Sequence, residues 1–308
     1  MHPAVRRLAY SLTRNIDGTL LGIVVALLAV GVLVLVSASN LSAARVTGQL
    51  GNMLVALCIL WLFANIPPHF LMRLALPLYI VGVLLLVAVA LFGDVIQGAR
   101  RWLDIGITRI QPSELMKIAV PLAMAWYFDR HEKTLRLGNY AVAAVMVVVP
   151  VALVARAAGL GTAGLITASG GLVLFPAGPF WRGIPGGAGG RPCALPHRWA
   201  AQRDYQRQRI LTLLDPSQDP LGAGYHTIQS MIAVGSGGWF GKGWLNGSQT
   251  HLDFIPERTT DFVFAVFAEE FGLLGCLALL CLYLAAISRG MFITANAPSL
   301  FARLICGA

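Results

Sequence analysis

Three uncharged apolar stretches of about 18–20 residues, at 19–37, 47–65 and 74–92, most restrict how this chain can fold. At a rise of about 1.5 Å per residue, each is long enough to cross the hydrocarbon core of a bilayer as a helix. Hydrophobic residues make up 57% of the chain and charged residues 12%, against roughly 45–50% and 25% in soluble domains. We therefore expect an all-α, polytopic helical membrane protein rather than a soluble globule.

Four later stretches are weaker candidates for membrane spans, at 113–128, 138–155, 160–180 and 262–288. The segment 183–203 lies between them and is aberrant for a span, because it is filled with Gly, Pro and Arg. The segment 204–261 is a polar loop that is rich in Gly and turn signals. We expect a single membrane domain over 1–308.

The basic residues flanking the spans predict the orientation of the chain. The first span is too long for the core of a signal peptide, so we expect a transmembrane helix there. Because Arg6, Arg7 and Arg14 precede this span, we expect the N-terminus in the cytoplasm. The loop 93–113 then lies outside although it contains three arginines, among them Arg101. Either this topology is wrong, or these outer cations serve an anionic partner.

The distribution of charge and cysteine excludes several classes of function. The net charge of +9 comes from short segments between the apolar stretches and not from a basic run with interleaved aromatic residues. This pattern argues against nucleic-acid binding. The five cysteines show neither a disulfide framework nor the spacing of metal ligands.

Glu114 and Lys117 are three residues apart, so they share a face of the expected helix and can form an ion pair. Ionisable residues within a span are costly and by default mark a functional site. The alternative is a pair near the membrane surface that only orients the helix. We predict a buried pair that lines a cavity.

Asp261 ends the polar loop directly before the last apolar stretch. An Asp at this place is a natural N-cap, which accepts hydrogen bonds from the free backbone N–H groups of the helix; catalysis is the competing interpretation. Glu269 and Glu270 lie two turns into the same stretch, where capping cannot explain them, and indicate a polar interior.

Four sequence motifs, in their order and spacing, closely resemble the SEDS family and within it the RodA branch. They are GARRWL at 98–103, QPSE at 111–114 followed by Lys117, DYQRQR at 204–209 leading to DPLGAGY at 219–225, and PERTTDF at 256–262 with Glu269 and Glu270. The resemblance extends over nearly the whole chain except 183–203.

The resemblance implies a ten-helix membrane glycosyltransferase that polymerises lipid II into peptidoglycan for cell elongation. It also implies a bacterial plasma (inner) membrane location and a class B penicillin-binding protein, with other membrane proteins of the elongation complex, as partners. The substrates would be lipid II and a glycan strand carried on undecaprenyl pyrophosphate. The essential Asp of the family, in its long extracytoplasmic loop, corresponds to Asp261, and its membrane Glu/Lys pair corresponds to Glu114 and Lys117.

These assignments match the chemistry, because the attacking 4-hydroxyl needs a base and the diphosphate needs positive charge. The resemblance therefore favours catalysis over capping for Asp261. Arg101, Lys117 and Arg258 are the expected diphosphate ligands, with Glu114 and Trp102 completing the predicted substrate site. A divalent cation could share the task of the cations, but no carboxylate cluster in the sequence indicates one.

The chain departs from the family pattern in three places. A seventh helix and the last two helices are missing, and the segment Arg156 to Thr162 lacks the expected Asp. A reading-frame shift that is later restored would explain 183–203. Since that segment is expected to fail to insert, 204–261 would remain on the cytoplasmic side, or reach the outside only at the expense of another span. In either case the chain would not be a competent polymerase. A flippase for the lipid-linked precursor and an inactive scaffold of the elongation complex remain the alternatives.

Overall fold

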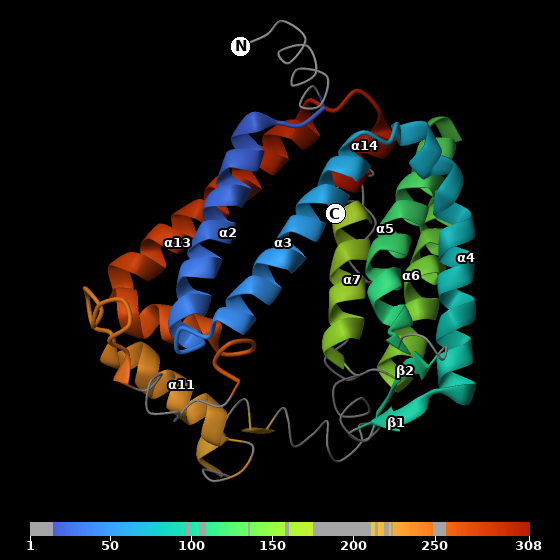
Figure 1. Ribbon diagram of the computed structural model, residues 1–308. Coiled ribbons are helices and arrows are strands. Elements are labelled where there is room, and N and C mark those ends of the chain that lie inside the picture. The colour runs from blue at the N-terminus through green and yellow to red at the C-terminus, as the bar shows by residue number, and fades with distance from the viewer. Residues whose placement is uncertain are drawn as a thin grey trace, which may run out of the picture. The chain divides into compact units, whose positions relative to one another are not determined.

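The computed structural model describes residues 15–96, 99–104, 109–134, 136–157, 160–174, 211–212, 215–218, 222, 224–248 and 257–308. Long helices dominate these parts, and the expected all-α class is confirmed (Figure 1). A small antiparallel sheet, which was not expected, accompanies the helices. The segment 183–203 and its neighbours up to Ile210 lie outside the described residues.

Five helices within the described parts are long and apolar enough to cross a membrane. They are α2 (Gly18–Ala38), α3 (Ala43–Ala64), α4 (Pro68–Phe92), the stretch Gly138–Ala155 of α6 (Leu137–Ala157), and α13 (Val263–Ala295). Two further expected spans form helices that do not meet this criterion, α5 (Pro112–Arg130) and the shorter α7 (Leu160–Leu174). Each expected span therefore forms a helix where the chain is described.

Local sequence determines where several of these helices begin. The Asp17 carboxylate caps α2 by accepting a hydrogen bond from the Leu20 N–H at 2.8 Å. Pro68 and Pro112 stand at the first positions of α4 and α5, where the missing N–H of proline costs nothing.

The chain forms two compact units. The first contains Met1–Asn65 and Arg203–Arg289, and thus α2, α3, most of α13 and the amphipathic helix α11 (Tyr225–Ser236). In this unit α2 and α13 run side by side (Figure 1). Arg289 of α13 bonds to Asp17 through Nη2–Oδ2 at 2.6 Å and Nε–Oδ1 at 3.1 Å, and these hydrogen bonds hold the pKa of Asp17 at about 2.

The second unit contains Ile66–Gln202 and Gly290–Ala308. Its helices α4, α5, α6 and α7 enclose the larger hydrophobic core, which includes Met116, Phe128 and Ile166. The short helix α14 (Leu300–Cys306) adds Phe301 and Leu304 to this core. The expectation of one domain over 1–308 stays a prediction.

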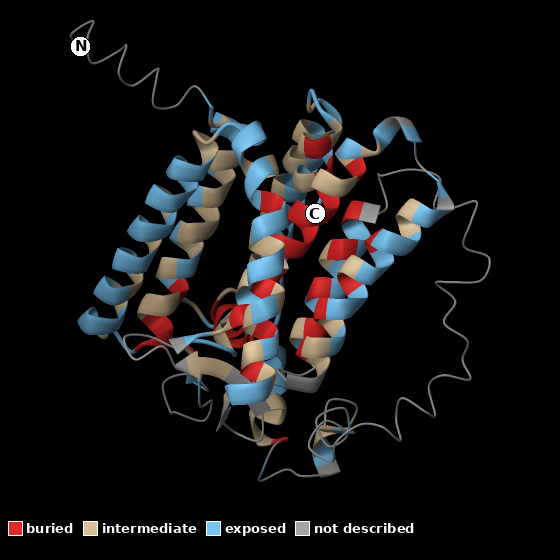
Figure 2. Cartoon of the chain, turned by 90° about the vertical axis from the view of Figure 1, so that its right-hand side faces the viewer, coloured by how far each residue is buried: buried red, intermediate tan, exposed pale blue. Residues whose placement is uncertain are grey.

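Outside these cores, the apolar helices keep long exposed stretches (Figure 2). Helix α3 contains no buried residue, although it is apolar enough to span. Exposed large hydrophobic side chains occur along α2, α3, α4 and α13. Such surfaces are stable only against lipid or further protein, in agreement with the expected membrane protein.

The described parts of the expected loops contain strands and short helices that were not predicted. Strands β1 (Asp94–Ile96), β2 (Ala99–Asp104) and β3 (Arg109–Ile110) form an antiparallel meander before α5. Leu103 pairs with Ile110, so β2 lies beside the residues that lead into α5. The helix α11 and a single 3-10 turn at Pro216–Gln218 interrupt the segment 204–261, for which we expected turns.

Candidate functional site

Asp261 lies in a tight turn, 257–262, directly before α13. The Glu257 carbonyl organises the turn by accepting hydrogen bonds from Thr260 N at 3.0 Å, Thr260 Oγ1 at 3.2 Å and Phe262 N at 3.4 Å. Glu257 adopts the left-handed conformation with φ of 55°. This closed turn leaves the Asp261 side chain exposed.

The Asp261 carboxylate does not cap α13. The helix begins at Val263, and the N–H of Ala265 donates to the carbonyl of Phe262. No hydrogen bond or ion pair joins the Asp261 side chain to any part of the chain that the structure describes. The role of Asp261 as catalytic base stays a prediction.

Arg258 fixes the same turn to the end of α2. Its Nε donates to the Ala38 carbonyl at 2.7 Å, and the residue is half-buried. Its cationic group is thus held three residues before Asp261. The role of Arg258 in binding a diphosphate stays a prediction.

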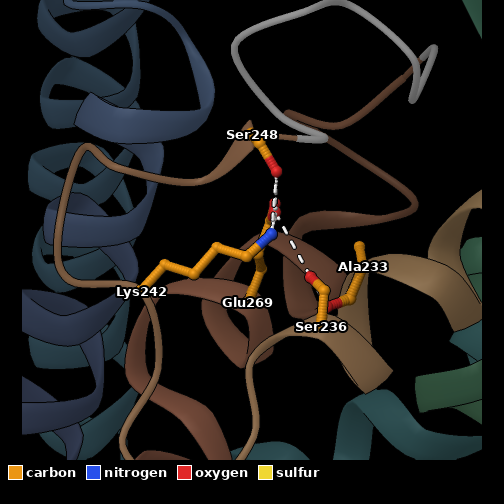
Figure 3. A network of polar contacts seen from close by, with 5 residues as sticks. All are labelled: Ala233, Ser236, Lys242, Ser248 and Glu269. Carbon is orange, nitrogen blue, oxygen red and sulfur yellow. Dashed lines mark hydrogen bonds and ion pairs between the residues drawn. The ribbon is translucent and has the colours of Figure 1, made fainter.

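Glu269 and Glu270 are 0% and 1% exposed, which confirms the expected polar interior of α13. Lys242 pairs with Glu269 through Nζ–Oε1 at 2.7 Å and also donates to Ser248 Oγ at 2.7 Å. The hydroxyls of Ser248 and Ser236 reach the same Glu269 oxygen at 3.2 and 3.4 Å (Figure 3). These partners of Glu269 were not predicted; a lysine in a loop rich in glycine was the available signal.

Glu270, like Glu269, forms a hydrogen bond with the loop 237–248. Its Oε1 accepts from the Ser37 hydroxyl of α2 and from Leu245 N, the latter at 3.2 Å. The backbone adds hydrogen bonds from Lys242 N to Glu269 O and from Gly243 N to Glu270 O, each 3.0 Å long. The two carboxylates therefore fasten the loop and α2 to one level of α13.

Glycine makes this close approach possible. Helix α13 bends at Gly272, which has φ of 63° and ψ of −163°. A Cβ there would collide with the backbone of Phe240 and Gly241, and a Cβ on Gly241 would collide with the Glu270 carbonyl. The bend therefore allows the backbone of Phe240 and Gly241 to pack directly against α13.

The remaining predicted site residues belong to the second unit. Glu114 and Lys117 form the expected pair, with Lys117 Nζ and Glu114 Oε2 2.7 Å apart. The prediction that the pair is buried is wrong: the side chains are 57% and 32% exposed for Glu114 and Lys117. Glu114 stands in the first turn of α5, at the helix end, where neighbouring helices do not enclose it.

Arg101 and Trp102 lie on β2, which pairs with the residues that lead into α5. Trp102 is half-buried. The structure thus groups these two residues with Glu114 and Lys117 in one unit, and groups Arg258 with Asp261 in the other. Among the described residues, no three His, Cys, Asp or Glu side chains gather in a way that could hold a metal ion, so we derive no step through a divalent cation.

Residues 18–308 match the family model FTSW_RODA_SPOVE, described as "Cell cycle protein". The peptidoglycan glycosyltransferase MrdB of Escherichia coli K12 is 47% identical over 294 residues, 95% of this chain and 80% of that protein. The probable peptidoglycan glycosyltransferase FtsW of Aliivibrio salmonicida is 33% identical over 90% of this chain and 71% of its own length.

Two solved structures share the fold. One is a chain from the work "Structural coordination of polymerization and crosslinking by a peptidoglycan synthase complex", with a TM-score of 0.77, 30% identity, and coverage of 94% of this chain and 82% of that chain. The other is the Thermus thermophilus rod shape determining protein RodA, with a TM-score of 0.65, 27% identity, and coverage of 94% and 79%.

Proposed function

This chain belongs to the FTSW_RODA_SPOVE family of cell cycle proteins, and from this premise we propose that it is a peptidoglycan glycosyltransferase that polymerises lipid II. It is a multi-pass membrane protein of the SEDS type, with several apolar helices that can span a bilayer. The observation that supports the proposal most directly is the exposed Asp261 carboxylate, held in a rigid turn and free of a capping role.

In the proposed reaction, the 4-hydroxyl of lipid II attacks the anomeric carbon of a glycan strand carried on undecaprenyl pyrophosphate. A glycosidic bond forms, the bond from the anomeric carbon to the diphosphate oxygen breaks, and the lipid pyrophosphate leaves. Asp261 takes the hydroxyl proton as general base. A carboxylate with no protein partner in the described residues is suited to this task, because a substrate hydroxyl can approach it directly.

The leaving diphosphate needs positive charge, which Arg258, Arg101 and Lys117 would supply. Arg258 lies in the same turn as Asp261, and its Nε bond to Ala38 restricts its orientation. Arginine can contact phosphate oxygens in a bidentate manner. Glu114 would orient the Lys117 ammonium through the ion pair that the structure contains, and Trp102 would complete the substrate site.

The position of the charges favours a polymerase over a flippase. A flippase needs its essential charges near the membrane midplane, along the path of the head group. Glu114 instead stands in the first turn of α5 and is exposed, and the buried Glu269 is already paired with Lys242. Both arrangements suit chemistry at a membrane surface.

The proposed setting is the bacterial plasma (inner) membrane, with the N-terminus in the cytoplasm and the Asp261 turn outside. This placement and the proposed activity depart from the expectation drawn from 183–203, a segment outside the described residues. A class B penicillin-binding protein would cross-link the product, and other membrane proteins of the elongation complex would associate with the pair. These partners follow from the function and from family resemblance.

The test is lipid II polymerisation by the purified chain with a class B penicillin-binding protein, comparing Asp261→Asn with Glu257→Gln. Both changes remove an exposed carboxylate from the same turn. Loss of a positioned base should slow glycan synthesis by about a hundredfold or more, whereas the Glu257 variant should remain close to the unsubstituted chain. Equal activity of both variants would reject Asp261 as base. Absence of glycan from the unsubstituted chain would contradict the proposal and favour the inactive scaffold.

A further inference from the structure

Each end of α2 is joined to the segment 257–295, which contains α13. At one end Arg258 bonds to the Ala38 carbonyl, and at the other Arg289 bonds to Asp17. Between these points lies a hollow of about 480 Å³. Its size falls within the range of roughly 300–1,000 Å³ that is usual for ligand pockets.

The hollow is lined almost entirely by apolar side chains. The lining residues are Leu27, Val30, Gly31 and Val34 of α2, and Val263, Phe264, Phe267, Cys276, Leu277, Leu279, Leu280 and Tyr283 of α13. The α13 residues come from both sides of the bend at Gly272. Such a surface suits a flexible hydrocarbon chain.

Several side chains that line the hollow are about half exposed. Phe264, Leu280 and Tyr283 line it and are 52%, 52% and 53% exposed. These residues belong to a helix that is long and apolar enough to span the bilayer. A lipid chain in the membrane can contact the exposed apolar side chains of such a helix.

One end of the hollow adjoins the candidate catalytic turn. Val263 lines the hollow and follows Asp261 by two residues, and Arg258 lies in the same turn. A lipid whose chain occupies the hollow thus leaves its polar end beside one carboxylate and one guanidinium. This pairing of an apolar channel with a cation and a base suits a prenyl diphosphate.

We propose that the hollow between α2 and α13 binds the isoprenoid chain of a polyprenyl diphosphate substrate and directs its diphosphate end to the Asp261 turn. The inference rests on the proposed function, since it assigns a place to the lipid carrier of that reaction. It adds a binding site for the hydrocarbon part, distinct from the residues predicted to contact sugar and diphosphate.

Two glycines of α2 provide a test with a matched control. Gly31 lines the hollow, and a Cβ there would meet nothing within 4 Å, so Gly31→Phe fills the hollow without a backbone clash. Gly22 is also free of neighbours within 4 Å and does not line the hollow. Gly22→Phe therefore makes the same chemical change on the same helix outside the site.

The full chain is placed in phosphatidylcholine nanodiscs with undecaprenyl diphosphate that carries a diazirine on its isoprenoid chain, and cross-links are mapped by mass spectrometry. The unsubstituted chain and Gly22→Phe should be labelled within Leu27–Val34 and Val263–Tyr283. Gly31→Phe should lower this labelling by about tenfold or more. If the phenyl ring keeps only two methylene groups of the lipid out of the hollow, the affinity for the lipid already falls about tenfold.

Undiminished labelling of Gly31→Phe, or labelling mainly elsewhere, would overturn the inference. A diazirine-bearing phosphatidylcholine that labels the hollow as efficiently would also overturn it, because the site would then hold any membrane lipid. Cross-linking does not require turnover, so the two proposals fail separately. If Gly31→Phe loses labelling and no variant polymerises lipid II, the glycosyltransferase proposal is rejected and the isoprenoid-binding hollow is kept. If Gly31→Phe polymerises lipid II normally, only the isoprenoid-binding hollow is rejected.

Discussion

Two ion pairs of equal length but different burial allow the contribution of a buried charge to be measured within one chain. In both Lys242–Glu269 and Lys117–Glu114, the Nζ and carboxylate oxygen are 2.7 Å apart, and the lysine side chains are 30% and 32% exposed. The acids differ, since Glu269 is 0% and Glu114 is 57% exposed. We predict that Lys242→Met destabilises the fold far more than Lys117→Met.

Removing one partner of a buried ion pair typically costs about 3–5 kcal/mol, because the other charge remains without compensation. Water reaches the partly exposed Lys242, and the hydroxyls of Ser236 and Ser248 still contact Glu269. We therefore expect about 2–4 kcal/mol for Lys242→Met, between the buried and surface limits. The exposed Glu114 is solvated without its lysine, so Lys117→Met should cost about 0–1 kcal/mol.

The measurement is reversible unfolding in mixed micelles of dodecyl maltoside and sodium dodecyl sulfate. The double variant Lys242→Met/Glu269→Gln serves as a control, because removing both charges leaves none uncompensated and should recover most of the loss. If Lys242→Met proves no more destabilising than Lys117→Met, burial of Glu269 does not determine the energetics of the pair. A double variant as unstable as the single one would refute the electrostatic explanation.

Three further predictions concern the first unit. Gly272→Ala should cost at least about 1–2 kcal/mol from the left-handed backbone alone, and more because its Cβ meets the backbone of Gly241; a normal melting temperature would contradict this. The pKa of Asp17 is lowered from 3.8 to about 2, so its contribution to the free energy of unfolding should be complete above about pH 4 and lost as the pH falls towards 2. Asp17→Asn should remove this pH dependence from unfolding measurements. In a chain without its native cysteines, Asn246→Cys should react with an impermeant maleimide outside intact cells; reaction only after permeabilisation would support failed insertion of 183–203.

The long helices could be predicted because their signal is local. An uncharged apolar run of about 20 residues leaves the chain few alternatives in a membrane. Helix α13 extends seven residues beyond the expected end at Ser288, because Arg289 finds Asp17 as a partner and no longer marks the end of the span. The strand β2 was not predicted because its few residues show no regular alternation of apolar and polar side chains. The helix α11 was not predicted because the segment around it is rich in glycine, which is typical of turns.

The candidate site was predictable in its residues and not in its geometry. The spacing of Glu114 and Lys117 determines that they meet, but their burial depends on where α5 begins relative to its neighbours. Glu269 and Glu270 could be recognised as buried, whereas their partners come from a loop and from α2, 21 to 233 residues away. A single sequence shows that Lys242 lies in a glycine-rich loop, but it does not show which distant carboxylate this lysine contacts.

The contacts of the charged residues along α13 separate structural from chemical roles. Arg258 binds Ala38, Glu269 binds Lys242, Glu270 binds Ser37, and Arg289 binds Asp17. Each of these contacts joins α13, or the turn before it, to a neighbouring segment. Folding therefore explains Glu269, Glu270 and Arg289, whereas Arg258 has a diphosphate contact as its proposed second role. Asp261 makes no such contact within the described residues, although it lies between two of these anchors. In the proposed function, the substrate hydroxyl supplies the partner that this exposed carboxylate lacks among the described residues.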